Sequence, residues 1–496
     1  MKKIKRRSFM GAGLALAGVT GISHAAPAKR PNILFIFSDD QCWDTLGCLG
    51  GEVITPNLDR LVKQGTLFTN AYNMGAWQGA VCMASRTMLM TGRSVWGAHA
   101  YYESNVRKKS DFWSNQFQQQ GYKTYFAGKW HIAGMMPPEI YDVAGTVRPG
   151  MPDYYDPATG KKFPWNVRGP GYFRPEAPGK DNWDPSDPKF GGHWEGGKHW
   201  SEVLGDEGIS FLEDAAQNDK PFFMQLAFNA PHDPRQSPKK YVDMYPLDSI
   251  RLPENFMPEN PYAEAMQAGK GVRDEDLAPF PRTEFSIKTH RQEYYAIITH
   301  MDDQIGRILQ TLEETGQRDN TLIVFTSDHG LGCGRHAMVG KQNMFEHSMK
   351  PPLIFCGAGI PKGRIIETPV YMQDLMPTTM DMAHIPIPSS VEFRSLRPII
   401  EGRKRKQYPS IYGAYKMSQR MVRKGDMKLI WYPNADKYLL FDLSRDALEM
   451  NDLSDHPEYA GVMKKLKGEL KKQQRFFKDP MLTGTAGNMS EEGVVH

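Results

Sequence analysis

Asn32-Ile33-Leu34-Phe35-Ile36-Phe37 is an apolar run that ends in the polar residues Ser38-Asp39-Asp40, and this pattern decides the fold class. Three later runs have the same form and also end in polar residues, at residues 122–127, 222–228 and 321–325. Short runs that are apolar throughout are typical of strands buried on both faces of a parallel sheet. The sequence therefore predicts several buried strands whose carboxyl ends carry polar side chains.

Helical patterns lie between these runs. Residues 293–315 repeat apolar side chains near a period of 3.6. Alternating strands and helices predict an α/β fold with a large, mainly parallel sheet sandwiched by helices. Ligands of such sheets bind beyond the carboxyl ends of the strands. We therefore expect the charged and imidazole groups at those ends to form one site.

Composition divides the chain into a main domain and a smaller one. We expect the main domain at residues 29–400 and a C-terminal α+β domain with an antiparallel sheet at 401–482. In the smaller domain, residues 421–431 and 437–443 suggest antiparallel strands, and 458–477 suggest a lysine-rich amphipathic helix. Residues 483–496 are polar and predict a loose tail.

An aromatic-rich insertion interrupts the main domain at about residues 147–202. It is rich in Gly, Pro and Asp and has little periodicity, which predicts long ordered loops. Its aromatic side chains either stack on sugar rings or pack the insertion onto the main body; they are Trp165, Tyr172, Trp183, Trp194 and Trp200.

Net charge argues against a nucleic-acid partner. The chain has 61 lysines and arginines against 57 aspartates and glutamates, and much of the excess lies in the first seven residues. The run Arg403-Lys404-Arg405-Lys406 is short and reads as a solvated loop. No basic block with interleaved aromatic residues appears, so we expect no nucleic-acid binding.

The first 25 residues predict a signal peptide. A basic start precedes a short apolar run at residues 11–22 and the small-residue cleavage site Ser23-His24-Ala25. Arg6-Arg7-Ser8-Phe9 resembles a twin-arginine export signal, and the Sec route remains open. No later run is long and apolar enough to span a membrane. We expect recognition by export machinery and a periplasmic or secreted protein without a stable membrane span.

One motif carries the chemistry: Cys82-Met83-Ala84-Ser85-Arg86-Thr87-Met88-Leu89-Met90-Thr91-Gly92-Arg93. Cys82 begins a predicted helix, and Arg86 lies four residues later on the same face. A helix N-terminus offers free N–H groups to anions, and a guanidinium adds a forked donor. By itself the motif is equally consistent with a buried cysteine near a helix start.

This segment resembles the signature of the type I, formylglycine-dependent sulfatases of the alkaline phosphatase superfamily, and the resemblance extends from about Pro31 to Leu453. It implies that Cys82 is oxidised to formylglycine, the nucleophile for sulfate-ester hydrolysis. Ala84 stands where proline is commoner, a variant associated with an anaerobic-type maturase. If Cys82 is modified, four cysteines remain, and up to two disulfides can form among Cys42, Cys48, Cys333 and Cys356.

Three carboxylates suggest a metal site. Asp39 and Asp40 end the first strand and Asp328 ends another, and carboxylates that face one cavity repel unless a cation lies between them. Oxygen ligands favour Ca²⁺ or Mg²⁺. The resemblance implies one calcium ion, bound also by residue 82 and, at the family's remaining position, by His329.

Further segments match sulfate-binding positions of the family. Gly128-Lys129-Trp130-His131 implies a lysine that bridges sulfate to residue 82 and a histidine that hydrogen-bonds the nucleophilic hydroxyl. His232 matches the histidine that serves the leaving group, and Lys341 matches the second sulfate lysine. Substrate contacts by His336, His193 and Trp194 are further predictions.

These features predict an exported sulfatase that acts on sulfated carbohydrate. One alternative is a phosphoester or phosphonate hydrolase of the same superfamily, since those enzymes share the fold. The other is a non-catalytic glycan-binding protein. The sugar, the sulfate position and the choice between exo and endo action are not encoded in these motifs.

Overall fold

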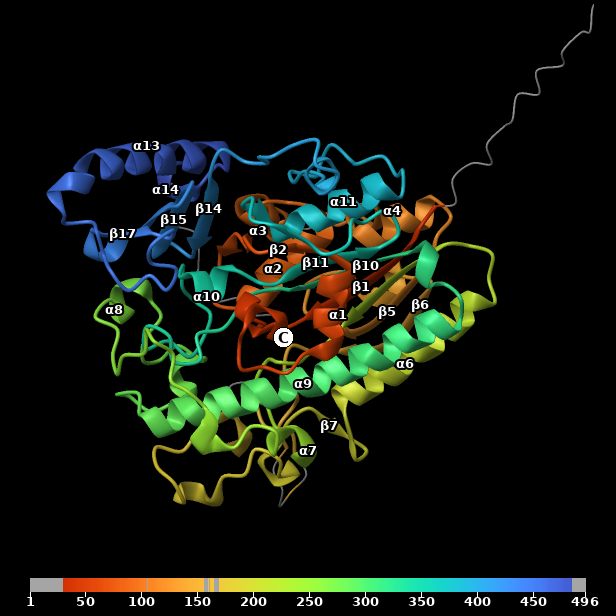
Figure 1. Cartoon of the computed structure of the whole chain (residues 1–496), viewed down its shortest axis with the longest axis horizontal. Coiled ribbons are helices and arrows are strands. Elements are labelled where there is room, and N and C mark those ends of the chain that lie inside the picture. The colour runs from red at the N-terminus through yellow and green to blue at the C-terminus, as the bar shows by residue number, and fades with distance from the viewer. Residues whose placement is uncertain (1–29, 105, 156–158, 160, 165–168, 484–496) are drawn as a thin grey trace, which may run out of the picture.

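The computed structural model describes residues 30–104, 106–155, 159, 161–164 and 169–483. The predicted signal peptide, Trp165 and nearly all of the predicted tail lie outside the described residues. An eight-stranded sheet forms the centre of the molecule (Figure 1). Its strands in spatial order are β12 (Arg364–Ile366), β2 (Gly65–Phe68), β11 (Leu353–Gly357), β10 (Thr321–Ser327), β1 (Asn32–Ser38), β9 (Phe222–Ala227), β5 (Lys123–Lys129) and β6 (Val143–Arg148).

The sheet is mainly parallel, as the sequence predicts. Only β11 runs against its neighbours β10 and β2. All seven residues of β1 are buried, because helices cover both faces of the sheet. Ile33, Phe35 and Phe37 face one cluster of buried residues, and Leu34 and Ile36 face another, as alternation along a strand requires.

Helices form the outer layers of this sandwich. In Figure 1, α9 (Glu284–Glu314) and α6 (Trp200–Ala216) lie below the sheet, and α2 (Val81–Thr91), α4 (Trp113–Gln119) and α11 (Leu375–Met382) lie above it. The helix predicted at residues 293–315 begins earlier, at Glu284. The Thr283 hydroxyl accepts a hydrogen bond from Ser286 N and caps this start. The additional turns bury mostly polar side chains, so they lack the apolar period.

A separate five-stranded sheet follows in the C-terminal region. Its order is β17 (Lys437–Asp442), β16 (Met427–Tyr432), β15 (Gln419–Lys424), β14 (Ile411–Tyr415) and β4 (Gly75–Ala76). The predicted strand at 421–431 is wrong as a single element: it is a hairpin, since Gly425 takes a left-handed conformation (φ 62°) and reverses the chain. The predicted lysine-rich helix is α13 (Ala460–Phe476), which packs on this sheet. The domain boundary at residue 400 stays a prediction.

The small sheet reaches into the main body through β4. This two-residue strand comes from the segment just before α2 and pairs in parallel with β14. Gly75 makes the pairing possible, because a Cβ atom there would lie 2.0 Å from the Ala414 carbonyl oxygen. The segment just before α2 is therefore anchored to the small sheet.

The insertion contains mainly loops and short 3-10 turns. Tyr172 is buried, and Trp183 packs 4.8 Å from Phe190 between ring centres. Trp200 begins α6 and stacks on the Arg148 guanidinium. Trp183 therefore packs within the insertion, and Trp200 links the end of the insertion to the last residue of β6.

Two further observations concern cysteines and membranes. Cys42, Cys48, Cys82, Cys333 and Cys356 are all free, so none of the disulfides that the sequence permits is formed. Among the described residues, no helix is both long and apolar enough to cross a membrane.

Candidate active site

Three carboxylates meet at the carboxyl edge of the large sheet. The register of β1 and β10 pairs Ser38 with Ser327, so the next residues, Asp39 and Asp328, emerge side by side. Asp40 takes a left-handed conformation (φ 69°), and its backbone N–H donates to Asp328 Oδ1 at 2.9 Å. The Tyr294 hydroxyl donates to the Asp40 carbonyl at 2.6 Å and supports this conformation. All three carboxylates are fully buried.

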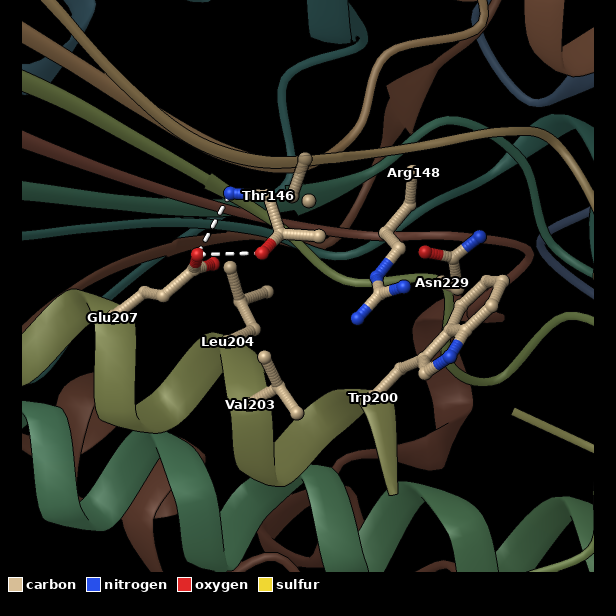
Figure 2. Close-up of a pocket in the computed structure, with 9 residues that line it drawn as sticks. Thr146, Arg148, Trp200, Val203, Leu204, Glu207 and Asn229 are labelled. Atoms are coloured by element: carbon tan, nitrogen blue, oxygen red, sulfur yellow. Dashed lines mark hydrogen bonds between the residues drawn. The ribbon is translucent and has the colours of Figure 1, made fainter. Parts of the chain in front are cut away.

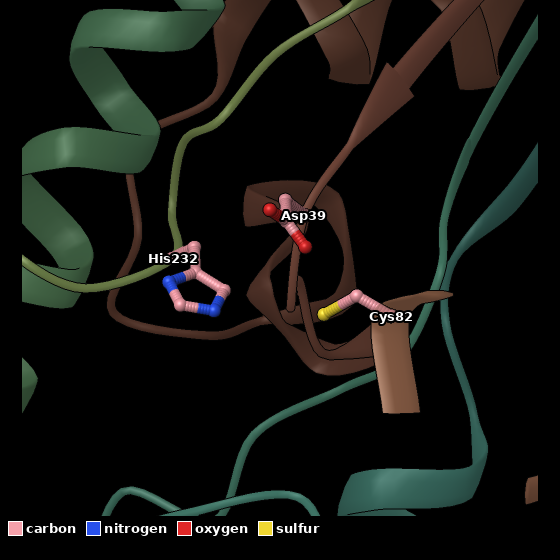
Figure 3. Close-up of side chains that lie close together, drawn as sticks. All are labelled: Asp39, Cys82 and His232. Atoms are coloured by element: carbon pink, nitrogen blue, oxygen red, sulfur yellow. The ribbon is translucent and has the colours of Figure 1, made fainter. Parts of the chain in front are cut away.

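Cys82 faces these carboxylates from the second position of α2. Figure 3 shows its thiol pointing toward Asp39, with the His232 ring close by. Cys82 Sγ lies 3.6 Å from Asp40 Oδ1 and accepts a hydrogen bond from Lys341 Nζ at 2.8 Å. In formylglycine an oxygen atom would replace this sulfur. The structure therefore gathers residue 82, carboxylates and a lysine at one point.

The residues at this point fit a hard cation. One ligand atom from each of Asp39, Asp40, Cys82 and Asp328 lies within 4.8 Å of the others. Asp39 Oδ1 is buried and has no hydrogen-bond partner, as expected of an oxygen kept for a metal. His329 lies outside this group; its Nε2 atom is 3.2 Å from the Val81 carbonyl oxygen, and its Nδ1 atom is buried without a hydrogen-bond partner.

Cations surround the carboxylates. Lys129, at the end of β5, pairs with Asp39, and Arg86 Nε contacts Asp328 Oδ2 at 3.2 Å. Burial opposes ionisation of Asp328, but Arg86 and Lys129 hold its pKa well below the usual value. Burial, against the opposing effect of Lys341 and together with repulsion from Asp39 and Asp328, raises the pKa of Asp40 to about 8. Without a metal, the ionised form of Asp40 is therefore the least favourable among the three carboxylates.

We predict a pH-dependent loss of stability in the metal-free protein. Because the pKa of Asp40 is higher in the folded than in the unfolded chain, stability is fully present below pH 3.8 and is lost as the pH rises toward 8. Asparagine cannot ionise, so Asp40→Asn does not lose this stability. Its free energy of unfolding should therefore rise relative to that of the wild type, by up to about 1.4 kcal/mol for each pH unit between pH 3.8 and 8. Urea unfolding in chelator at pH 5, 6, 7 and 8 measures this difference. A constant difference contradicts the prediction.

Two histidines border the site. His232 follows β9 and lies 3.7 Å from Asp40 Oδ2 through Nε2, while its Nδ1 is 2.7 Å from the Asp233 carbonyl oxygen. Burial, followed by Lys341 and Lys129, lowers the pKa of His232 well below its usual value. Burial, Lys129 and Arg86 do the same to the pKa of His131. Both rings are thus neutral at pH 7 before substrate binds.

Asp274 and Glu275 hold the loop that carries Lys341, and sequence reasoning missed both. The buried Glu275 carboxylate accepts hydrogen bonds from Val339 N and Gly340 N, each at 2.9 Å. Asp274 Oδ2 accepts from Gln342 Nε2 at 2.7 Å. No motif identifies these acidic residues, because they contact the lysine loop only after the chain folds back.

We expect Glu275→Ala to lower both stability and activity. The change leaves Arg282, which pairs with Glu275 at 2.6 Å, without its buried carboxylate. Breaking such a pair costs about 3–5 kcal/mol of unfolding free energy. Exposed Glu264 is the control, and Glu264→Ala should change both quantities little. Urea unfolding and hydrolysis rates test this, and wild-type values for Glu275→Ala would refute it.

The three predicted substrate contacts have structural partners. His336 stacks on Phe345 at 4.0 Å between ring centres and lies 3.0 Å from the Leu448 carbonyl oxygen. His193 is fully buried, and its Nε2 atom is 3.3 Å from the carbonyl oxygen of His232. Trp194 is partly exposed and packs against His199. His193 thus supports the backbone of His232, and contact of these side chains with substrate stays a prediction.

A small pocket lies between the ends of β5, β6 and β9 and the first turns of α6 (Figure 2). Glu207 Oε1 accepts hydrogen bonds there from both Thr146 N and Thr146 Oγ1 at 2.7 Å. Arg148 stacks on Trp200 there and pairs with Glu195. None of the residues grouped around Cys82 lines this pocket, so it belongs to the packing of α6.

Comparison with known proteins defines the class. Residues 31–385 match the family model described as Sulfatase, and residues 334–476 match the one described as N-sulphoglucosamine sulphohydrolase, C-terminal. An arylsulfatase from Clostridium perfringens is 31% identical over 473 residues, covering 87% of this chain and 91% of the relative. An N-acetylglucosamine-6-O-sulfatase from Bacteroides thetaiotaomicron is 26% identical over 556 residues, covering 94% and 91%. These matches identify the chain as a sulfuric ester hydrolase.

Solved structures share the fold. One, in complex with its substrate D-glucosamine-2-N,6-O-disulfate, has a TM-score of 0.69 and 24% identity, covering 91% of this chain and 99% of the other. A phosphonate monoester hydrolase from Silicibacter pomeroyi has a TM-score of 0.73 and 21% identity, covering 90% and 95%. The chain belongs to the sulfatase family and is a type I sulfatase of the alkaline phosphatase superfamily.

Proposed function

We propose that this sulfatase is exported and removes sulfate from carbohydrate, using formylglycine at position 82 and one calcium ion. The observation that carries the proposal is the position of Cys82 at the start of α2, where its sulfur meets three buried carboxylates and Lys341. A cysteine without modification is a poor nucleophile here. Burial, Asp328 and Asp39 raise the pKa of its thiol well above the usual value in the metal-free protein.

Conversion to an aldehyde hydrate solves a chemical problem. A hydrated formylglycine has two hydroxyls on one carbon: one can attack sulfur, and the second can then release sulfate, which a serine or cysteine cannot do. Ala84 supports an anaerobic-type maturase as the partner that makes this residue. The N-terminal signal supports modification before or during export.

The charged residues have distinct roles in this proposal. Asp39, Asp40 and Asp328 would hold calcium, which when bound would supply a Lewis acid beside residue 82. Lys129 pairs with Asp39 and Lys341 pairs with Asp40, so both side chains would lie close to the oxygens of a bound sulfate group. Arg86 fixes Asp328 and donates to the Lys129 carbonyl at 2.8 Å, so it aligns the end of β5 with α2. His329 stays the predicted further ligand of the metal.

The two histidines supply proton transfer. A neutral imidazole at His131 can accept the proton of the attacking hydroxyl. His232 gives a proton to the departing alcohol. Burial, followed by Lys341 and Lys129, depresses the pKa of His232 before substrate binds, and an anionic sulfate ester would offset the effect of the two cations. Substrate thereby raises the pKa of its own proton donor.

Sulfated carbohydrate is the proposed substrate class. Relatives named for such substrates include an N-acetylglucosamine-6-O-sulfatase and an ulvan-active sulfatase from Formosa agariphila, the latter 26% identical over 467 residues. The predicted export signal supports action on carbohydrate outside the cytoplasm, in the periplasm or beyond. Partly exposed Trp194 supports sugar contact near the site.

Two measurements test the proposal. Purified protein from its native host should hydrolyse an aryl sulfate faster than the matching aryl phosphate or phosphonate, and a panel of defined sulfated oligosaccharides should then identify the sugar. Carbonyl trapping with mass spectrometry of the Cys82 peptide should detect the aldehyde. A preference for phosphonate would favour the hydrolase class of the Silicibacter structure. An unmodified thiol with no hydrolysis of any ester would favour a glycan-binding protein.

A further inference from the structure

The outer face of α13 carries a dense set of unpaired cations. Lys464, Lys465, Lys471 and Lys472 are all exposed on this helix. In the part of the chain that the structure describes, none of them has a carboxylate oxygen within 4.0 Å of its ammonium nitrogen. Glu469, the helix's one acidic residue, points inward and pairs with Lys424. All the charged side chains on the outward face of α13 are therefore positive.

The positive charge of this face is unusual for the molecule. The helix has six cationic residues and one acidic residue, and the first seven residues of the chain have five cations. Together these two segments carry more positive charge than the net charge of +4 of the whole chain, so the remainder of the chain is net negative. The local field at α13 therefore differs in sign from the average of the remaining chain.

The lysines form two columns along the helix. With 3.6 residues per turn, Lys464 and Lys471 fall on one flank, and Lys465 and Lys472 fall on the other. Each column repeats after seven residues, which is about 10.5 Å at 1.5 Å per residue. This arrangement presents paired cations at regular intervals to an extended polymer.

Glycines lie between the two columns. Gly461 and Gly468 occupy the strip between the lysine flanks, and a Cβ atom at either would meet nothing within 4 Å. Glycine inside a helix costs about 0.5–1 kcal/mol relative to alanine. The strip between the two lysine columns is therefore open, because no side chain projects from these two glycine positions.

We infer that this basic face of α13 binds the sulfated polysaccharide chain at a distance from the sulfate that is cleaved. The inference rests on the proposed action on sulfated carbohydrate, whose polymers are polyanions. A membrane surface fits less well, because the apolar side of α13, with Leu466 and Leu470, is already buried against the small sheet. Lysine-rich segments are typical of proteins that bind heparin-like polyanions.

Binding of dextran sulfate to catalytically inactive Cys82→Ala protein tests the inference separately from catalysis. In this background, Lys464→Gln/Lys465→Gln/Lys471→Gln/Lys472→Gln should weaken binding on the order of tenfold at low salt, with a smaller dependence on salt concentration. Glutamine keeps helix propensity. The control removes four dispersed exposed lysines, Lys63, Lys109, Lys220 and Lys362, and should change binding less than about twofold.

A second variant has opposite effects on stability and binding. Gly468→Gln should raise the thermal unfolding temperature, because glutamine has the higher helix propensity, and still weaken dextran sulfate binding, because its side chain fills the strip. Equal weakening by the dispersed control, or unchanged binding in the helix variant, overturns the inference. Equally tight binding of duplex DNA or anionic vesicles also overturns the polysaccharide assignment. Loss of binding in the helix variant supports it even if hydrolysis of sulfated sugars fails, which would refute only the proposed function.

Discussion

Replacing Cys82 with alanine should reduce sulfate-ester hydrolysis by at least about 10⁴-fold while the protein stays folded. The change removes the atom that lies 3.6 Å from Asp40 and 2.8 Å from Lys341, and with it the precursor of the nucleophile. Neither neighbour loses its other partner, because Lys341 still pairs with Asp40. Sulfate release and thermal unfolding of the same preparation give both results.

Cys356→Ala is the matched control for this prediction. Cys356 is also a buried free cysteine, but it lies in β11 within the core of the large sheet. Its loss should leave the rate of hydrolysis within about twofold and cost on the order of 1 kcal/mol of stability through a small cavity. Hydrolysis by Cys82→Ala above about 1% of the wild-type rate would mean that another residue is the nucleophile.

Asp328→Asn and Asp40→Asn should both lower turnover by at least about 10³-fold, yet change stability in opposite directions. Asp328 is held ionised by Arg86, so its loss leaves a buried guanidinium short of a partner and costs about 3 kcal/mol. Burial disfavours the charge of Asp40, so its neutralisation should raise the stability of the metal-free protein at pH 7 by about 1 kcal/mol or more.

Calcium titration completes this second prediction. Wild-type protein should gain about 2.7 kcal/mol of stability at calcium concentrations 100 times the dissociation constant, and both variants should lose most of that gain. Denaturant unfolding of the wild type and the two variants, first with chelator and then with calcium, measures the six values. A calcium-dependent gain of wild-type size in Asp40→Asn would place the metal elsewhere, and destabilisation of metal-free Asp40→Asn at pH 7 would contradict the electrostatic account.

Much of this site can be predicted from short segments of the sequence. Each carboxylate of the site, and Lys129, follows or ends a strand, and parallel strands bring their carboxyl ends to one edge. The predicted positions of Asp39, Lys129 and Asp328 therefore follow from apolar runs alone. The role of Cys82 required the whole motif, since a single buried cysteine carries no such information.

Other features depend on contacts between distant segments. Tyr294 was expected only as an apolar position of a helix, yet its hydroxyl fixes the left-handed conformation of Asp40. The Lys341 loop is held by Asp274 and Glu275, about 65 residues earlier in the chain. His336 is near the cluster in sequence, but its ring is committed to Phe345 and the Leu448 carbonyl.

By itself, the sequence determined the mainly parallel sheet, the sulfatase motif at Cys82 and the order of the charged residues, because strand burial and motif spacing are written in neighbouring residues. Only the tertiary structure decided that β4 joins the small sheet to the start of α2, that His329 points to the Val81 carbonyl, and that all five cysteines are free. The physical reason is that these features depend on backbone pairings and distances between segments far apart in the chain, which local patterns of polarity do not specify.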